Sequence, residues 1–130
     1  MEKDGKVKGK EYIYEERNGK VFYFPGKLLF EGEYLNDNKN GKGKEYFDGR
    51  LMFEGEYLDD LKHGKGKQYY ENGKLLFEGE YLNDLKWNGK GYNLNHYLAY
   101  ELKDGKGKMK EIIYVKNIIL LVNYFLKVNI

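Results

Sequence analysis

Cysteine is absent from this chain of 130 residues, proline occurs once and histidine twice. Without cysteine the protein can form neither a disulfide bond nor a thiolate zinc site. The two histidines, His63 and His96, fall in expected loops at inequivalent positions of the sequence pattern. Because no nucleophile motif accompanies them, we predict no catalytic site, no metal site and no cofactor, and therefore a protein that is not an enzyme.

Long apolar runs and a strong charge of one sign are also missing. Four of the first six residues are charged with no apolar run behind them, and the longest uncharged stretch of the tail, 117–126, is about half a membrane-spanning helix. We therefore expect a cytoplasmic protein without a signal peptide or transmembrane segment. The formal net charge of +2 lies wholly in residues 109–130, so residues 1–108 are neutral. A neutral body does not favour nucleic acid or an anionic membrane as a partner.

Aromatic residues and glycine, by contrast, are abundant. The chain has 14 tyrosines and 17 glycines, and the phrase Phe-Glu-Gly-Glu-Tyr occurs at 30–34, 53–57 and 77–81. Between these copies, Gly-Lys-Gly-Lys at 41–44 and 64–67 leads to an Asp-Gly or Asn-Gly corner. Such corners between extended runs are strong β-hairpin signals. The sequence therefore predicts an all-β fold, an elongated single-layer meander of antiparallel β-hairpins.

The corner of the first hairpin predicts its register. A two-residue turn at Asp48-Gly49 places Tyr46 opposite Leu51 and Lys44 opposite Phe53. The second copy is one residue longer at this point, and the same turn there would exchange its two faces.

A longer loop in the second hairpin restores the pairing. A three-residue loop at 71–73, with its glycine left-handed, places Tyr69 opposite Leu75 and Lys67 opposite Phe77. We therefore predict a tight turn in the first hairpin and a bulged one in the second.

Alternation along strands with this register places aromatic rings and lysine stems on one face and more acidic residues on the other. Rings beside cations can hold a peptide, a base or a sugar, so this aromatic face is the candidate binding surface. The competing interpretation is that the rings pack against the next strand while the lysine stems lie over them. The candidate binding residues are Lys42, Lys44, Tyr46, Phe53, Tyr57, Lys65, Lys67, Tyr69, Phe77 and Tyr81.

The glycines and glutamates of the repeated phrase have structural interpretations. Gly32, Gly55 and Gly79 are expected beneath rings of neighbouring strands, because a glycine within a strand marks a close approach to the backbone. The paired glutamates, such as Glu54 and Glu56, recur in every copy, so we expect them to form cross-strand pairs with lysines and not an active site.

These residues carry a family resemblance. The pattern Gly-Lys-x-x-Gly-Lys-x-x-x-Tyr-x-x-Asn-Gly-Lys-Leu-x-Phe-Glu-Gly-Glu-Tyr resembles the MORN repeat (membrane occupation and recognition nexus), in its bacterial-style variant. The match is strong over 30–82, fair from Val7 and degenerate over 100–109. The resemblance implies an elongated array of hairpins that serves as a scaffold or interaction module.

The rest of the chain extends this array. The tail is rich in isoleucine, leucine and valine, and its pattern favours either an amphipathic helix over 115–127 or a terminal strand, which would cap the array or bind a partner. Further expected elements are strands at 8–14, 21–24 and 28–35, a turn at Asn18-Gly19, and polar connections at 36–40 and 59–63. The predicted domains are an array at 1–108 (repeats near 7–29, 30–52, 53–76 and 77–99, degenerate at 100–108) and a basic, apolar tail at 109–130.

The function predicted from these features is a non-catalytic scaffold. It would bind a protein partner, or a second copy of itself, through the aromatic face or the tail, and a homodimer could form through the tail or a sheet edge. One alternative is a membrane- or phospholipid-associated module that uses the basic, apolar tail. Another, implied by the family resemblance alone, is an antitoxin-like binder of a bacterial toxin.

Overall fold

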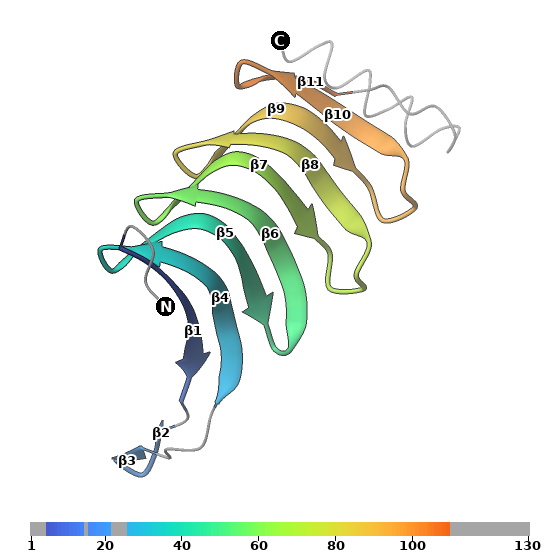
Figure 1. Ribbon diagram of the computed structural model, residues 1–130. Helices are drawn as coiled ribbons and strands as arrows, with labels where there is room; N and C mark the ends of the chain where they lie inside the picture. The colour runs from blue at the N-terminus through green and yellow to red at the C-terminus, as the bar shows by residue number, and fades with distance from the viewer. Residues whose placement is uncertain (1–4, 15, 22–25, 110–130) are drawn as a thin grey trace.

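The computed structural model describes residues 5–14, 16–21 and 26–109, and within them every regular element is a β-strand (Figure 1). Nine strands form one sheet in the order β1-β4-β5-β6-β7-β8-β9-β10-β11, and β2 pairs with β3 in a separate hairpin. The strands are β1 Lys6–Ile13, β2 Glu16–Arg17, β3 Lys20–Val21, β4 Lys27–Leu35, β5 Asn38–Phe47, β6 Arg50–Leu58, β7 Leu61–Tyr69, β8 Leu75–Leu82, β9 Leu85–Tyr92, β10 Leu98–Lys103 and β11 Lys106–Met109.

Each strand of the large sheet pairs antiparallel with its neighbours, so the chain runs back and forth along one elongated layer (Figure 1). The predicted all-β meander is therefore confirmed. The small β2–β3 hairpin, which turns at Asn18-Gly19, lies between β1 and β4 in the sequence. It projects beyond the ends of these two strands (Figure 1). Residues 22–25, which include most of a predicted strand, and the predicted tail helix or strand lie outside the described residues.

The hairpin corners have the predicted conformations. Asp48 and Gly49 both adopt positive φ, 51° and 79°, as a two-residue turn between right-twisted strands requires. In the next hairpin, the backbone N–H of Tyr70 donates to Lys74 O, and the N–H of Gly73 donates to Tyr70 O, which closes a three-residue loop. Gly73 is left-handed, with φ of 84°.

The third corner repeats this three-residue geometry without glycine. The Asn93 N–H donates to Tyr97 O, and the His96 N–H donates to Asn93 O. His96 takes the left-handed position, with φ of 63°, which asparagine, aspartate and histidine tolerate better than most residues.

The connections between repeats are shorter than predicted. They are two-residue turns at 36–37, 59–60 and 83–84, in which both residues have positive φ. The remainder of each predicted polar connection, 38–40 and 61–63, belongs to strands β5 and β7. The physical reason is that asparagine and aspartate adopt the left-handed conformation at low cost, so a tight turn forms there without glycine.

The predicted register is correct beside the corners and wrong beyond them. Tyr46 pairs with Leu51 as expected, but the next pair is Glu45 with Phe53, because β6 has one extra residue at this point. A bulge of this kind turns all following side chains to the other face. Lys44 consequently lies opposite Glu54 and not opposite Phe53.

The second hairpin has the same bulge. Tyr69 pairs with Leu75 as predicted, whereas Phe77 faces Gln68 and Lys67 faces Glu78. The predicted combination of Lys44 and Lys67 with the rings on one face is therefore wrong in both copies, because the bulge places these two lysines on the face opposite the rings.

A column of paired glycines crosses the sheet as a result of this register. Going from β1 to β9, each strand places a glycine opposite the glycine of its neighbour: Gly9, Gly32, Gly43, Gly55, Gly66, Gly79 and Gly89. A side chain at any of these positions would point to the aromatic face, where phenylalanine and tyrosine rings fill the space above the column.

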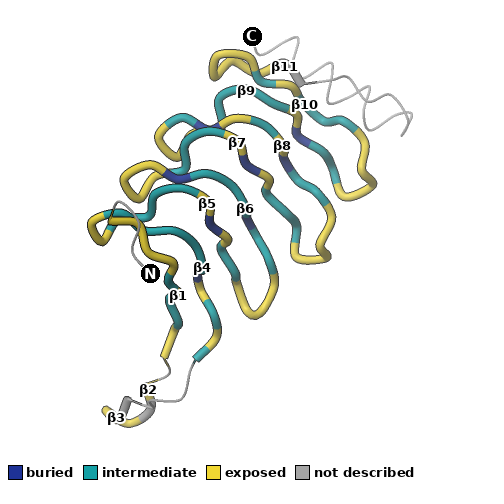
Figure 2. The backbone as a smooth tube through the Cα atoms, viewed as in Figure 1, coloured by how far each residue is buried: buried dark blue, intermediate teal, exposed yellow. Residues whose placement is uncertain are grey.

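The core of this single layer consists of those rings. Phe30, Phe53 and Phe77 are at most 1 % exposed, and Tyr57 and Tyr81 are 5 % exposed. Neighbouring phenylalanine and tyrosine rings meet edge to face, for example Phe53 and Tyr81 with centroids 5.2 Å apart. Figure 2 shows that the buried positions recur from strand to strand while the turns at both margins are exposed.

The predicted packing of rings over glycine is confirmed at Gly32 and Gly55, although the rings come from the same strand, and it is not seen among the nearest atoms at Gly79. A Cβ on Gly32 or Gly55 would lie 2.8 Å or 2.7 Å from the ring of the phenylalanine two residues earlier in the same strand, and not from a ring of a neighbouring strand. At Gly79 the nearest atoms are backbone atoms of β9. Glycine is required here because both rings and strands approach too closely for a methyl group.

Candidate binding groove

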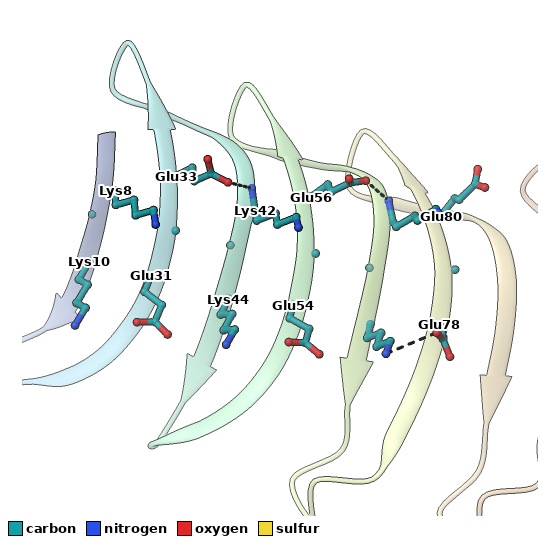
Figure 3. Close-up of a pocket in the computed structure, with 18 of the residues that line it drawn as sticks. Lys8, Lys10, Glu31, Glu33, Lys42, Lys44, Glu54, Glu56, Glu78 and Glu80 are labelled. Carbon is teal, nitrogen blue, oxygen red and sulfur yellow. Dashed lines mark hydrogen bonds and ion pairs between the residues drawn. The ribbon is translucent and has the colours of Figure 1, made fainter. Parts of the chain in front are cut away.

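The face opposite the rings carries an open groove of about 1320 Å³ that crosses strands β1, β4, β5, β6, β7 and β8. Its floor is the backbone of the glycine column, which has no side chains on this face. Lysine and glutamate side chains form two rows beside the floor (Figure 3). One row is Lys10, Glu31, Lys44, Glu54, Lys67 and Glu78; the other is Lys8, Glu33, Lys42, Glu56, Lys65 and Glu80.

The charges of the groove alternate from strand to strand. Strands β1, β5 and β7 contribute lysines, while β4, β6 and β8 contribute glutamates, so each lysine lies opposite a glutamate. Examples are Lys44 with Glu54 and Lys65 with Glu80. The expected register of lysine opposite glutamate is therefore confirmed, and among these groove pairs the structure shows an ion pair between Lys67 and Glu78. The six lysines and six glutamates that line the groove balance each other in charge.

The glutamates in the first row are held by tyrosines and by one lysine. The Tyr46 hydroxyl donates to Glu31 at 2.7 Å, and the Tyr69 hydroxyl donates to Glu54 at 2.5 Å. Burial, together with these hydrogen bonds, raises the pKa of both phenols to about 12. The phenols therefore remain neutral donors at ordinary pH. The third glutamate, Glu78, pairs with Lys67 at 3.8 Å.

The glutamates in the second row bind mainly to backbone. The backbone N–H of Lys42 donates to Glu33 at 2.9 Å, and that of Lys65 donates to Glu56 at 2.7 Å. Glu80 accepts a longer hydrogen bond, 3.5 Å, from the side chain of Asn88. Every glutamate of the groove consequently has a partner within the protein.

The lysine ammonium groups of the groove differ in this respect. Lys67 forms the ion pair with Glu78. The other five (Lys8, Lys10, Lys42, Lys44 and Lys65) have no hydrogen bond or ion pair from Nζ to any residue that the structure describes. The groove therefore presents ammonium groups that are available to a ligand beside carboxylates that are already engaged.

The aromatic face, by contrast, is closed by the protein's own lysines. Lys39 Nζ lies 4.3 Å from the centre of the Phe30 ring, Lys62 Nζ lies 4.3 Å from that of Phe53, and Lys86 Nζ lies 5.0 Å from that of Phe77. These positions are those that a cationic ligand would take on aromatic rings. Together with the burial of the rings, they leave this face without an accessible aromatic surface at these phenylalanines.

The structure thus divides the predicted binding residues into three groups. Lys42, Lys44, Lys65 and Lys67 line the groove, and Tyr46 and Tyr69 hold its glutamates. Phe53, Tyr57, Phe77 and Tyr81 are core residues of the opposite face. The prediction missed Lys8, Lys10 and all the glutamates. A search for the register that pairs glycine with glycine and lysine with glutamate would have found them.

The two histidines do not form a common site with acidic residues. His63 lies on β7, where its Nδ1 is buried without a hydrogen-bond partner among the described residues, and His96 stacks on Tyr92 at 5.0 Å. Within residues 5–14, 16–21 and 26–109, no group of three or more His, Cys, Asp or Glu side chains is arranged to hold a metal ion. The same residues contain no helix that is long and apolar enough to cross a membrane.

Comparison with known proteins agrees with the geometry. No curated protein is significantly similar to the chain. The family model of the MORN repeat matches residues 30–49 and 53–74, which span the β4–β5 hairpin and the β6–β7 hairpin with the loop that follows it. The glycine column and the rows of lysine and glutamate continue from these two segments into β1, β8 and β9. The central part of this chain is therefore built of MORN repeats.

Proposed function

We propose that this protein is a non-catalytic scaffold that binds a segment of another protein in the groove. A repeated sheet of MORN repeats is suited to such a role, because each repeat adds an equivalent section of surface along one axis. The observation that carries the proposal is the set of five lysine ammonium groups that have no partner among the described residues, along a groove whose floor bears no side chains.

The groove is a better candidate than the aromatic face. A binding surface needs accessible groups, and the phenylalanine rings are almost completely buried beneath tyrosines and lysines. The groove instead is open, and its polar groups lie at repeating intervals. A membrane surface, whose negative charges are not spaced to match the lysines, would face all six lysines and all six glutamates at once, and these charges balance, which supports a protein partner over a lipid one.

Selection from a random peptide library displayed on phage tests this proposal with the full chain as bait. The groove variant is Lys42→Ala/Lys44→Ala/Lys65→Ala. The matched control, Lys20→Ala/Lys103→Ala/Lys106→Ala, removes exposed lysines outside the groove. Circular dichroism and urea unfolding establish that both variants are folded.

Peptides enriched by the unmodified protein should bind the control variant unchanged. They should bind the groove variant about tenfold more weakly, as expected for the loss of several exposed charge contacts. Absence of enrichment, or equal binding to the groove and control variants, would contradict the proposal.

A further inference from the structure

We infer that the groove recognises an acidic segment in an extended, polyproline II conformation with a carboxylate at every third residue. This inference rests on the proposed function and names the chemical class of the partner. Three observations carry it: the charge that is left available in the groove, the spacing of that charge, and the narrow floor.

The groups of the groove that are left open to a ligand are cationic. All six glutamates have protein partners, whereas five of the six lysines have none among the described residues. A cationic ligand would compete with the hydrogen bonds that Tyr46, Tyr69 and two backbone N–H groups already make to the carboxylates. An anionic ligand replaces only water at the ammonium groups. The groove therefore favours a carboxylate-bearing partner.

The positive charge recurs on every second strand. Neighbouring strands lie about 4.8 Å apart, so the lysines of β1, β5 and β7 recur at about 9.6 Å along the groove. A polyproline II helix advances about 9.3 Å in one turn of three residues, so a side chain at every third position returns to the same side at nearly this interval. Carboxylates in that pattern would each lie beside a lysine-bearing strand. The uncharged residues between them would lie over the glutamate-bearing strands.

The repeat distances of other conformations do not match the spacing of the lysines. An α-helix returns to the same side about every 5.4 Å and would bring each second turn over a glutamate-bearing strand. A β-strand repeats its facing side chains at about 6.6 Å, which matches neither the lysine spacing nor the strand spacing. A single nucleic-acid strand carries a phosphate at every nucleotide, so its charges would also lie over the glutamates.

The shape of the floor agrees with a single extended chain. The two charged rows stand on residues that are two apart in each strand, such as Lys42 and Lys44, so their Cα atoms are about 6.6 Å apart. This separation is narrower than an α-helix with its side chains, which is about 10 Å across. Since the glycine column places no side chain between the rows, the backbone of an extended chain can approach the floor closely.

The experiment uses synthetic peptides and the full chain. A fluorescent peptide of about four Pro-Pro-Glu triplets has the inferred spacing. A permuted peptide has the same composition, with its glutamates at every second position and the remaining prolines together at one end. A Pro-Pro-Lys peptide reverses the charge, and a single-stranded oligouridylate represents dense polyanions. Fluorescence anisotropy measures each affinity for the unmodified protein, the groove variant and the control variant.

We expect the Pro-Pro-Glu peptide to bind about tenfold more tightly than the permuted peptide and to lose about tenfold in affinity on the groove variant but not on the control variant. Equal binding of the permuted peptide would overturn the inferred spacing. Tighter binding of the Pro-Pro-Lys peptide would overturn the inferred charge, and tighter binding of the oligouridylate would overturn the partner class.

Failure of this inference is distinguishable from failure of the proposed function. If phage selection yields groove-dependent peptides that lack acidic residues at every third position, the scaffold function stands and this inference fails. If selection yields no groove-dependent peptide and the Pro-Pro-Glu peptide does not bind, both are wrong.

Discussion

The hydrogen bonds of the tyrosine hydroxyls on the aromatic face differ between repeats because of a single residue. Tyr34 and Tyr57 donate to glutamates on the preceding odd-numbered strands, Glu11 and Glu45, each at 2.5 Å. The corresponding partner for Tyr81 would be residue 68, which is glutamine. The hydroxyl of Tyr81 is buried and has no hydrogen-bond partner in the described structure. A buried hydroxyl in this state lowers stability, because it loses its hydrogen bonds to water without replacement.

The variant Gln68→Glu should therefore be more stable than the unmodified protein. The new carboxylate would accept the hydrogen bond of Tyr81 as Glu45 accepts that of Tyr57, a gain of about 1 kcal/mol in the free energy of unfolding. Urea unfolding measures this change. The reciprocal variant Glu45→Gln should lose stability, and a lower urea midpoint for Gln68→Glu would contradict the explanation.

A methyl group in the glycine column should have the opposite effect. In Gly66→Ala the new Cβ would lie 2.8 Å from the Phe53 ring and 3.0 Å from the Tyr81 ring, and neither buried ring has free space. Overpacking of this kind costs about 2 kcal/mol. Thermal unfolding should show the loss. The matched variant Gly107→Ala meets only the end of the flexible Leu102 side chain, so a similar loss there would argue against ring packing as the cause.

At the scale of the element, the inter-repeat turns at 59–60 and 83–84 are bonded to the preceding repeat. The Asp60 N–H donates to Lys39 O, and the Lys39 N–H donates to the Asp60 carboxylate at 2.7 Å. Asp84 makes the same pair of hydrogen bonds with Lys62. The side chains of Lys39 and Lys62 lie over the core rings, so these bonds connect the turns to the packing of the aromatic face.

Removal of one of these side chains should weaken the contact between repeats. Asp60→Gly keeps the left-handed backbone, with φ of 70° in the present turn, and removes the carboxylate acceptor. We expect the free energy of unfolding to fall by about 1 kcal/mol in urea titrations. Asp37 occupies the same turn position but makes no such bond within the described residues. Asp37→Gly should therefore be nearly neutral, and equal losses in both variants would exclude the hydrogen bond as the cause.

The strand pairing also shows how far the sequence predicts this fold. The Asp48-Gly49 and 71–73 corners were predictable, because positive φ, at both residues of the first corner and at Gly73 in the second, restricts the residues that fit. The bulge beyond them was not, since it has no residue signature of its own. It decides which side chains share a face, and for this reason the predicted binding surface combined groove lysines with core rings. Complementarity between facing strands, glycine with glycine and lysine with glutamate, was the informative signal.

For the whole molecule, tyrosine ionisation predicts unfolding at alkaline pH. Burial, followed by hydrogen bonding to glutamates, raises the pKa of Tyr46 and Tyr69 to about 12 and that of Tyr57 further. An unfolded tyrosine has a pKa of about 10. Because the folded values are the higher ones, these phenols contribute stability that is fully present below pH 10 and is lost as the pH rises through 12.

The urea midpoint should accordingly fall steeply between pH 10 and pH 12, and the tyrosinate absorbance should increase together with unfolding. The decline should be shallower in the variant Tyr46→Phe/Tyr69→Phe, because it lacks both phenols. An unchanged decline in this variant would exclude Tyr46 and Tyr69 as the cause of alkaline unfolding.

The two margins of the sheet differ in how much variation they permit. Every turn between repeats has two residues, whereas the opposite margin holds a two-residue turn at 48–49, three-residue loops at 71–73 and 94–96, and the whole β2–β3 hairpin (Figure 1). The extra residue of the second repeat is thus accommodated at that margin, and the glycines of the column remain opposite one another. Insertions or grafted peptide epitopes should be tolerated at 71–73, so this array could serve as a display frame whose groove is unaffected by what its outer loops carry.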